Sequence, residues 1–464
     1  MYASSNIETS FKGIAPPLGL LYIAKTLKNE GDNVTILDFS AESFNEQKLI
    51  NEVKTADIVG VSVLSYSLNC SVEIINIIKK AKPKIKVIIG GPHCTLFPKK
   101  VLEETQADIS VQGDGEIIIN DIKNAIIENG GFSKINGIYY KENAQIKKGA
   151  PLKLIEDLNS IPIPSRHLIE KYNYGKEYNP NIKKGEFTSV IMSRGCPFSC
   201  KFCSRNSISM KTYRTRSAEN TLEEIKELNN LGYKYIAFED DSFLSNKKEV
   251  LKLFDGIIKE QIDMKFIITA ARVDAADKEL FQKMKIAGVT HLQFGFESGN
   301  QDVLDFYNKK TTIKEIKKAV NLSNKIGFFT IGTFIFGAPF ETKNHFETTK
   351  NFAKSLALDS VYFTPLKYVA GSELWCEAVN QGKISQNEYI IQVGSEKNLS
   401  LLSQNEIEKY CNKANREYYL RPKFIFNLLK KSLKNDDLGF LRSYISLFLS
   451  NIKSSFEFFG IIAK

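Results

Sequence analysis

The chain has 464 residues, of which 43% are hydrophobic and 25% are charged. This composition is ordinary for a globular protein of two or three domains, and it argues against a low-complexity or solenoid-repeat protein. The formal net charge is +10, and residues 411–464 contribute +6 of it through ten Lys and Arg against four Asp and Glu. A basic tail of this kind is compatible with acidic lipid, nucleic acid or simple solubility.

Cysteine usage and hydropathy bear on the compartment. Three of the seven cysteines lie in one short motif, which argues against a disulfide framework and indicates a reducing cytoplasm. The polar N-terminus lacks the apolar core of a signal peptide. Since no run of about 18 apolar residues occurs, we expect no transmembrane helix.

Residues 1–130 alternate between short apolar runs and amphipathic stretches. We expect strands near 34–39, 58–63, 85–89 and 109–112, and helices near 18–27, 46–55, 71–80 and 99–105. This alternation predicts an α/β domain with a parallel, flavodoxin-like (Rossmann-type) sheet, which binds ligands beyond the carboxyl ends of its strands. Two glycine-rich turns fall at those ends, Gly90-Gly91-Pro92-His93 and Gly113-Asp114-Gly115-Glu116, where a backbone can approach a flat ligand.

Residues 131–185 are predicted to link two domains. Residues 137–146 have the pattern of a short hairpin. Residues 161–166 are expected to be extended, because each proline of Ile161-Pro162-Ile163-Pro164 restricts the residue before it.

Cys196, Cys200 and Cys203 follow a strand-like run with the spacing C-x3-C-x2-C. Thiolates are soft ligands that favour iron–sulfur clusters, zinc or Cu(I). A structural zinc site takes four ligands, and no His or Cys follows at zinc-finger spacing. Three thiolates fit a 4Fe–4S cluster whose fourth iron is open to a small molecule. Buried core thiols and a zinc loop are the alternatives.

Residues 186–385 contain six repeated units. The expected strands are 187–193, 234–239, 265–270, 290–296, 328–336 and 360–364, and the helices after the first five are 218–230, 247–260, 276–287, 312–325 and 344–356. Parallel units of this length predict a (β/α)6 partial TIM barrel with its site at the carboxyl ends of the strands.

Candidate binding residues follow four of these strands. In strand order they are Glu239 with Asp240, Arg272, Glu297 with Ser298, and Gly337 with Pro339. Carboxylates there can accept hydrogen bonds from an ammonium group or from ribose hydroxyls, and an arginine can pair with a carboxylate. Helix capping and ordinary salt bridges are the alternative roles. Further candidates for contact with a substrate are Tyr213, Arg214 and Arg216 after the cysteines, and Tyr362, Pro365 and Tyr368 at the last strand.

The cysteine spacing, with Phe202 before the third cysteine, resembles that of the radical S-adenosylmethionine (SAM) enzymes. The resemblance implies that Cys196, Cys200 and Cys203 bind a 4Fe–4S cluster whose open iron chelates SAM. It implies reductive cleavage of SAM to methionine and a 5′-deoxyadenosyl radical, with electrons from a donor such as flavodoxin or ferredoxin. Phe202 is then expected near the adenine.

The strand-end residues named above resemble the SAM-binding motifs of the same family, position by position. The resemblance implies that Glu297 contacts the polar end or the ribose of SAM. It implies that Arg272 contacts a carboxylate, and that the backbone at Gly337 and Pro339 approaches the adenine.

Pro16-Pro17-Leu18-Gly19 and the two glycine-rich turns, in this order ahead of the cysteines, resemble the cobalamin-binding domain of class B radical SAM enzymes. The resemblance implies a corrinoid across residues 62–67, 90–95 and 113–116, with contacts from Ser62, Ser65, Gly91, Pro92 and Gly113. This domain usually opens with a strand before the Pro-rich loop, and this chain begins inside the loop, so we expect that strand to be missing. His93 lies outside any Asp-x-His-x-x-Gly motif, and we expect no protein imidazole on the cobalt.

Residues 386–464 are predicted to form a helical C-terminal region. Residues 423–433 and 438–459 have the pattern of basic amphipathic helices, which can lie on an anionic membrane or pack on the barrel and close its pocket. Tyr418 to Pro422 resembles the tail of the subgroup that contains anaerobic magnesium-protoporphyrin ester cyclase and lipid-modifying enzymes. That resemblance implies a small-molecule or lipid-like substrate.

The expected domains are a cobalamin-binding domain (1–130), a linker (131–185), a radical SAM barrel (186–385) and a helical region (386–464). The leading hypothesis is a cobalamin-dependent radical SAM methyltransferase that acts on an unactivated carbon. An oxidative cyclase or C–C coupling enzyme on the same scaffold is the first alternative. A non-catalytic iron–sulfur carrier or binding protein is the alternative from another class, and RNA binding would require steep salt dependence.

Overall fold

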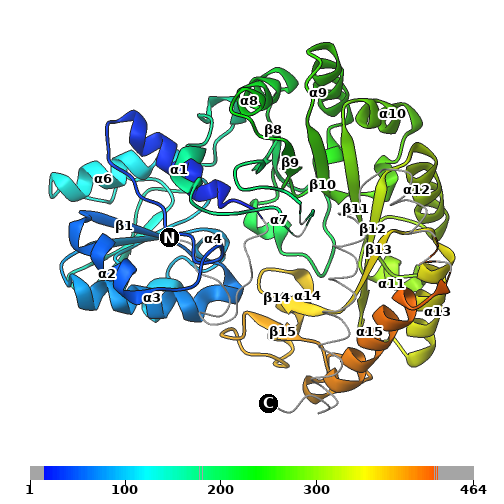
Figure 1. Cartoon of the computed structure of the whole chain (residues 1–464). Coiled ribbons are helices and arrows are strands. Elements are labelled where there is room, and N and C mark those ends of the chain that lie inside the picture. The colour runs from blue at the N-terminus through cyan, green and yellow to red at the C-terminus, as the bar shows by residue number, and fades with distance from the viewer. Residues whose placement is uncertain (1–14, 177, 180, 423, 425, 427–464) are drawn as a thin grey trace. The chain divides into compact units, whose positions relative to one another are not determined.

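The computed structural model describes residues 15–176, 178–179, 181–422, 424 and 426. The chain forms two compact units that exchange short segments. The first unit contains the described residues up to Tyr174, together with Ser193–Gly195 and Arg205–Asn220. The second contains Gly175–Met192, Cys196–Ser204 and the chain from Thr221 onward. Figure 1 shows the elements of both units by colour along the sequence.

The first unit is built on a five-stranded sheet in the order β1-β2-β3-β4-β5. The strands are β1 (Ile58–Ser62), β2 (Lys86–Gly90), β3 (Ile109–Val111), β4 (Ile138–Glu142) and β5 (Gln145–Lys148). The first three are parallel, and the hairpin β4–β5 adds to β3 in the antiparallel sense. The helices are α1 (Leu18–Asn29), α2 (Glu46–Thr55), α3 (Leu68–Ala81), α4 (Pro92–Leu96), α5 (Lys100–Glu104), α6 (Ile119–Ile127) and α7 (Arg205–Ile208).

Branched aliphatic side chains form the core of this sheet. Ile109, Ile122 and Ile138 are at most 1% exposed and belong to one buried cluster. β-Branched residues suit a strand that is covered by helices, because their stiff side chains pack well on a pleated surface. The alternation of apolar strands and amphipathic helices therefore predicted the parallel strands β1, β2 and β3 of this unit correctly.

One expected strand is absent from this unit as described. Residues 34–39 were expected to pair in the sheet, and Ile36, Leu37 and Phe39 are indeed buried. However, the segment carries no assigned strand, and only Asp38 is recorded as a single bridge residue. The backbone N–H of Asp38 donates to the hydroxyl of Tyr172 at 3.0 Å. The prediction of a full strand at 34–39 was therefore wrong for the described structure.

The second unit contains a six-stranded parallel sheet in the order β13-β12-β11-β10-β9-β6. Its strands are β6 (Phe187–Val190), β9 (Tyr235–Phe238), β10 (Lys265–Ala271), β11 (Val289–Glu297), β12 (Phe329–Phe336) and β13 (Ser360–Pro365). The helices after them are α8 (Ala218–Asn230), α9 (Lys247–Lys259), α10 (Lys278–Ile286), α11 (Gln301–Phe306), α12 (Ile313–Ile326) and α13 (Lys343–Ser355). The predicted fold class, a partial (β/α)6 barrel, is confirmed.

Helix ends in this unit follow from local capping chemistry. Asn246 and Asp277 accept hydrogen bonds from the third residue of α9 and α10, and Thr312 forms a capping box with Glu315 at the start of α12. Gly327 ends α12 in the left-handed conformation. These caps satisfy the free backbone groups at the helix ends, which is why the sequence alone placed the helices within a few residues.

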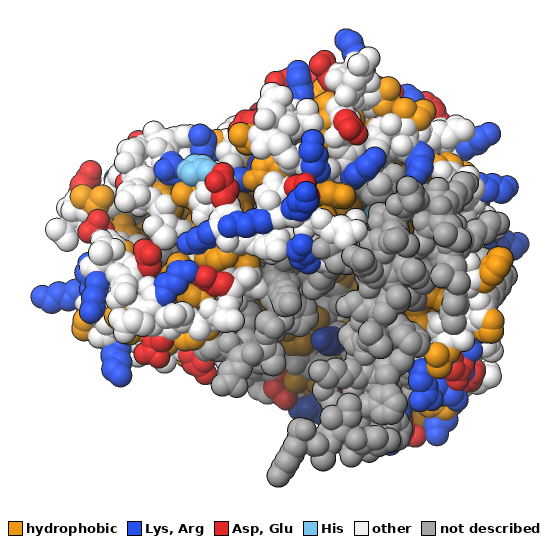
Figure 2. Space-filling view, viewed as in Figure 1, with side chains coloured by type: hydrophobic (Ala, Val, Ile, Leu, Met, Phe, Trp, Pro, Cys, Tyr) orange, Lys and Arg blue, Asp and Glu red, His pale blue; other side chains and the backbone are white. Residues whose placement is uncertain are grey.

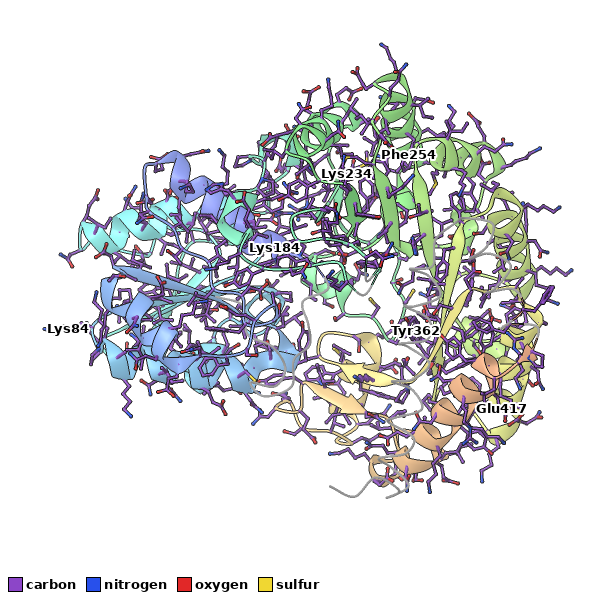
Figure 3. The ribbon with its side chains drawn as sticks, viewed as in Figure 1. Lys84, Lys184, Lys234, Phe254, Tyr362 and Glu417 are labelled. Atoms are coloured by element: carbon purple, nitrogen blue, oxygen red, sulfur yellow. The ribbon has the colours of Figure 1, made fainter. Side chains whose placement is uncertain are left out.

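Aromatic side chains fill the space between the sheet and its helices. Phe254 of α9 and Phe266 of β10 are fully buried, with ring centroids 6.4 Å apart. Figure 1 shows α9, α10, α12 and α13 along one side of the strands, and Figure 3 labels Phe254 on that side. On β12 every second residue is buried and the others are half-buried, so only one face of the strand is covered by helices.

Smaller elements complete the two units. The antiparallel pair β7 (Ser193–Gly195) and β8 (Tyr213–Thr215) belongs to the first unit. The second unit also has β14 (Lys367–Val369), β15 (Ile390–Gln392), α14 (Glu373–Asn380) and α15 (Gln404–Tyr419). α15 packs on β13, where the Tyr419 hydroxyl accepts from the backbone N–H of Val361 at 3.0 Å. The predicted helices at 423–433 and 438–459 lie almost wholly outside the described residues.

Charge is mixed on the described surface. In Figure 2, basic and acidic side chains of the described residues intermingle on the face shown. None of the described helices is both long enough and apolar enough to cross a membrane.

Candidate functional site

The three cysteines of the motif lie on an irregular loop of the second unit. Their side chains are neither disulfide-bonded nor fully buried. The backbone N–H of Cys203 donates to the carbonyl of Cys200 at 3.0 Å, so these two residues belong to one tight turn. A loop of this kind can present several sulfurs to one centre, as a cluster requires.

The segment after α11 holds this loop in place. The backbone N–H of Lys201 donates to the carbonyl of Tyr307 at 3.0 Å, and Asn308 Nδ2 donates to the carbonyl of Ser199 at 2.9 Å. The ring of Phe202 packs edge-on against Tyr307, with centroids 5.1 Å apart. The loop is thus fixed by contacts that do not depend on the cysteine side chains.

Two cations lie close to the cysteine loop. The Arg272 guanidinium stacks over the ring of Phe198 at 3.6 Å, and its Nη2 donates to the carbonyl of Lys309 at 2.8 Å. Burial raises the pKa of the Cys200 thiol, while the positive charges of Lys309 and Arg272 act to lower it. The cations favour the thiolate, which is the form that binds iron.

Lys309 and Glu297 form a buried ion pair beside Arg272. Lys309 Nζ lies 2.6 Å from Glu297 Oε1, and the two side chains are 9% and 7% exposed. Burial lowers the pKa of Lys309, but the neighbouring carboxylate outweighs it, so the pKa is raised and the lysine stays charged. Glu297 also has a φ of +65°, in the left-handed region that side chains rarely adopt. Strain of this kind gathers at functional positions.

Both residues keep polar atoms free for a ligand. Arg272 binds Asp274 through Nε and Nη2, and its Nη1 has no hydrogen-bond partner among the described residues. Glu297 uses Oε1 for Lys309, and its Oε2 likewise has no partner in the described part of the chain. One free cationic donor and one free carboxylate oxygen therefore lie within the same cluster of charges.

The remaining strand-end residues lie at the same edge of the sheet, but several have structural partners. Glu239 accepts from the Tyr178 hydroxyl at 3.2 Å, and both oxygens of Asp240 accept from the backbone of Met192, at 3.1 and 3.2 Å. The buried Ser298 hydroxyl accepts from the backbone of Asn300 at 3.1 Å. Asp240 and Ser298 thus stabilise local structure, and their assignment to SAM stays a prediction.

Gly337 and Pro339 follow β12 in a turn that a buried carboxylate holds. The backbone N–H groups of Gly337 and Ala338 both donate to Glu341 Oε2 at 2.7 Å. Among the described residues, Glu341 Oε1 and the hydroxyl of Tyr307 are buried without a hydrogen-bond partner. Burial raises the pKa of Glu341 to about 7, because the two backbone donors only partly offset the loss of water.

This shift makes stability depend on pH. The carboxyl loses its proton near its ordinary pKa of 4.5 in the unfolded chain, but near about 7 in the folded one. Folding therefore favours the protonated form, and stability falls as pH rises between these values. Glu341→Gln lacks this titration and should gain about 3 kcal/mol relative to the parent between pH about 4 and about 8. Urea unfolding at several pH values measures the gain, with the exposed Glu227→Gln as control. If the free energy of unfolding changed with pH equally in all three proteins, the prediction would be contradicted.

The expected corrinoid contacts lie together in the first unit. Ser62 ends β1 opposite Gly90 of the parallel strand β2, and a Cβ placed on Gly91 would meet the carbonyl of Val63 at 3.0 Å and Ser62 Oγ at 3.3 Å. Gly91 also has a φ of +103°, so the turn demands glycine. Pro92 begins α4 directly after it. Glycine thus lets the turn after β2 pack closely against the end of β1.

Two further residues of these turns have internal partners. His93 is fully buried, and its Nδ1 lies 3.0 Å from Ser65 Oγ. Burial lowers the pKa of His93 to about 4, so the ring is neutral at physiological pH. Gly113 follows β3 with a φ of +68°, and its N–H donates to Thr95 Oγ1 at 3.1 Å. The assignment of Ser65 and Gly113 to a corrinoid stays a prediction.

The uncovered face of the second sheet is lined by hydroxyl-bearing and aromatic side chains. On β12 and β13, Thr333 pairs with Tyr362, and Tyr362 is 39% exposed. Figure 3 labels Tyr362 on this part of β13. Thr269 Oγ1 donates to the carbonyl of Phe238 at 2.8 Å, which binds its hydroxyl to the neighbouring strand. Tyr362 therefore remains a candidate for contact with a substrate, whereas Tyr368 is buried.

Sequence reasoning missed several residues of the site. Lys309, Phe198, Tyr307 and Glu341 were not singled out. Phe198 lies inside the cysteine motif, where an aromatic residue is a usable signal. Nothing local distinguishes Lys309 from the adjacent Lys310, because its burial is a property of the folded chain.

The residues fit a cluster by the chemistry of their donor set, which is three thiols outside any disulfide, with cations beside Cys200. In the part of the chain that the structure describes, no three His, Cys, Asp or Glu side chains converge on a single metal ion. In a 4Fe–4S cube each cysteine binds a different iron, so its ligands are spread more widely than those of one ion.

Comparison with known proteins identifies both units. Residues 190–353 match the family model of the radical SAM superfamily, and residues 7–123 match that of the B12 binding domain. The uncharacterized methyltransferase PH0819 of Pyrococcus horikoshii is 31% identical over 443 residues, which cover 92% of this chain and 94% of that protein. The anaerobic magnesium-protoporphyrin IX monomethyl ester cyclase of Cereibacter sphaeroides is 29% identical over 384 residues, 79% of this chain and 61% of the cyclase.

Solved structures share this fold. The radical SAM methyltransferase TsrM from Kitasatospora setae superposes with a TM-score of 0.68 at 17% identity, over 82% of this chain and 75% of TsrM. The cobalamin-dependent radical SAM enzyme OxsB superposes with a TM-score of 0.70 at 16% identity, over 98% of this chain and 80% of OxsB.

A corrinoid-type α/β unit joined to a partial barrel with a three-cysteine loop defines a class of iron–sulfur enzymes. This chain belongs to the radical SAM superfamily and carries a B12-binding domain. It is therefore an enzyme whose cofactors are a 4Fe–4S cluster, SAM and cobalamin, as the sequence predicted. Enzymes of this superfamily act on small molecules and need a reductant.

Proposed function

We propose that the protein is a cobalamin-dependent radical SAM methyltransferase that acts on an unactivated carbon. The observation that carries the proposal is the similarity over nearly the whole chain to a protein described as a methyltransferase. Both family models match this chain. When bound, the cluster supplies the electron that cleaves SAM, and the corrinoid carries the methyl group. The barrel mouth then needs no basic side chain to remove hydrogen from the substrate.

The described contacts support specific roles for the site residues. Cys196, Cys200 and Cys203 hold the cluster. The free Nη1 of Arg272 pairs with the carboxylate of SAM, and the free Oε2 of Glu297 accepts from its ammonium or ribose. Phe202, beside the buried Tyr307, supplies the apolar surface for the adenine. Glu239, Gly337 and Pro339 complete the pocket, and Ser62, Gly91 and Pro92 contact the corrinoid.

Product analysis tests the reaction type. Anaerobically purified protein, reconstituted with iron, sulfide and cobalamin, is incubated with SAM, a reductant and candidate substrates. A methyltransferase of this kind consumes two SAM per product and forms 5′-deoxyadenosine and S-adenosylhomocysteine in equal amounts. Formation of 5′-deoxyadenosine alone with a productive substrate would contradict the proposal.

An oxidative cyclase is the second candidate, because the cyclase of Cereibacter sphaeroides is 29% identical over 384 residues. Such an enzyme forms 5′-deoxyadenosine without S-adenosylhomocysteine, and its product gains no methyl group. The chain spans only 61% of the cyclase. The methyltransferase relative matches over nearly its full length, which favours methyl transfer.

The finer features of the proposal concern substrate, donor and compartment. A small-molecule or lipid-like substrate is proposed because aromatic and threonine side chains line the uncovered face of the barrel sheet. Flavodoxin or ferredoxin is the proposed donor. None of the seven cysteines, all of which lie in the described residues, forms a disulfide, which supports a reducing compartment. We propose domain limits at 1–130, 131–185, 186–385 and 386–464.

Arg272→Lys tests the proposed carboxylate contact. Lysine keeps the charge, but it loses the planar stack on Phe198 and the fork of donors. We expect the dissociation constant for SAM to rise by about ten- to a hundredfold. Equilibrium binding to the cluster-loaded protein measures the change, and Lys252→Met on the exposed side of α9 is the control. Unchanged SAM affinity in Arg272→Lys would argue against the contact.

A further inference from the structure

The acidic turn after β3 is the centre of a buried charge cluster within the first unit. Asp114 Oδ1 accepts from Arg194 Nη1 at 2.7 Å, and Asp114 Oδ2 accepts from Arg214 Nη1 at 2.5 Å. Glu116 Oε1 accepts from Arg194 Nη2 at 2.6 Å. The four side chains are between 7% and 17% exposed, so water screens these charges weakly.

The two arginines face each other across a short pair of strands. Arg194 of β7 lies directly opposite Arg214 of β8 in the antiparallel register. Like charges in opposed positions destabilise a strand pair. Asp114 binds both guanidinium groups, and Glu116 supplies the second negative charge, so the cluster is balanced at two positive and two negative charges.

The Asp114 carboxylate also binds the backbone of the segment that follows β5. The N–H of Ile155 donates to Asp114 Oδ2 at 3.0 Å, and the Ile155 carbonyl accepts from Arg214 Nη1 at 2.5 Å. Burial alone would raise the pKa of Asp114, but the hydrogen bond and charge of Arg214, with Arg194, hold it below its usual range. Asp114 thus stays ionised in place and is saturated by donors.

The strands β7 and β8 are the two stems of the cysteine loop. Gly195 ends β7 and Cys196 is the next residue, while β8 begins at Tyr213, after the third cysteine. Gly195 has a φ of +87°, and a Cβ there would overlap the carbonyl of Thr212. The two strands therefore lie close together where the loop begins. Arg194 and Arg214 bind them to Asp114 in the turn that carries Gly113.

We infer that Asp114 and Glu116 are positioning residues for the loop that carries the cluster cysteines, acting through Arg194 and Arg214. The turn at 113–116, through Asp114 and Glu116, then also fixes where both stems of that loop begin. The inference rests on the proposed role of the cysteines as cluster ligands. The contacts that carry it lie wholly in the first unit.

Asp114→Asn tests the inference in the full chain without cofactors. Asparagine keeps the shape and one acceptor oxygen, but it leaves two buried guanidinium groups opposed. Hydrogen exchange followed by mass spectrometry should show exchange at 193–195 and 213–215 faster by about tenfold or more, since bonds to charged groups are lost. Exchange in β10–β12 should stay unchanged. Glu103→Gln, on the exposed side of α5, is the control.

A second readout separates positioning from general stability. After reconstitution, Asp114→Asn should retain iron, yet show a changed electron paramagnetic resonance response of the reduced cluster when SAM is added. The double variant Asp114→Asn with Arg214→Gln should regain part of the slow exchange, because it removes one of the opposed cations. A merely structural role would predict additive losses and an unchanged spectrum.

The outcomes are distinguishable from those for the reaction itself. Parent-like exchange at both stems together with a parent-like spectrum would overturn the inference, even if methyl transfer were demonstrated. Altered stems and spectrum would support it, even if the product proved to be that of a cyclase. Should Asp114→Asn fail to fold, Glu116→Gln removes only one partner of Arg194 and should shift both readouts in the same direction; no shift would overturn the inference.

Discussion

Cys200→Ser is expected to abolish cleavage of SAM. Serine oxygen is a hard ligand that replaces thiolate poorly on iron, so the cluster should not assemble and the absorbance near about 400 nm should be lost. Formation of 5′-deoxyadenosine under reductant should fall by about a thousandfold or more, as is usual when a central catalytic group is removed. Anaerobic absorbance, iron content and product analysis measure the three effects.

Cys376→Ser is the matched control, because Cys376 is an exposed free thiol outside the motif. This variant should keep its iron, its absorbance and its rate of SAM cleavage. Retention of iron-dependent absorbance and activity in Cys200→Ser would refute the assignment of the cysteine loop. The same test applied to Cys196 and Cys203 should give the same result, because each thiolate binds a separate iron.

Lys309→Met is expected to destabilise the fold strongly. Lys309 Nζ and Glu297 Oε1 lie 2.6 Å apart with side chains less than a tenth exposed, so the variant leaves an unpaired carboxylate in a poorly solvated place. Removing one partner of such a pair costs about 3–5 kcal/mol. Urea unfolding of the cofactor-free protein, monitored on the second unit, measures the loss.

The double variant Lys309→Met with Glu297→Gln gives the decisive comparison. Because it removes both charges, it should recover most of the stability that the single variant loses. It should nevertheless bind SAM poorly, since the free Oε2 of Glu297 has been replaced. Lys252→Met, which breaks an exposed pair on α9, should be stable like the parent. If Lys309→Met were as stable as the parent, the pair of Lys309 and Glu297 would be solvated and the prediction would be wrong.

Much of the fold could be predicted from local patterns. α2 was expected at residues 46–55 and spans Glu46–Thr55, and the six parallel strands of the barrel lie within a few residues of their predicted places. Apolar periodicity and capping residues act over a few positions, so they are visible without the rest of the chain. The strand expected at 34–39 is reduced to a single bridge residue at Asp38, whose backbone N–H donates to Tyr172, 134 residues away.

The candidate site also has features that the sequence predicts and features that it does not. The cysteine spacing by itself indicated the cluster, because ligand type and spacing are chemical facts of a short segment. The strand-end positions of Arg272 and Glu297 also followed from the order of strands. Their partners could not be predicted in this way. Lys309 pairs with Glu297 across 12 residues, and its burial depends on the path of the chain after α11.

The amino-acid sequence alone determined the class of this protein, since three spaced thiols and the alternation of strands and helices need no long-range information. The tertiary structure decided which charges are paired, which are buried and which atoms stay free. Asp114 meets Arg194 across 80 residues and Arg214 across 100. Such pairs arise because folding removes water from distant segments together, and a buried charge is stable only where the chain brings its counter-charge.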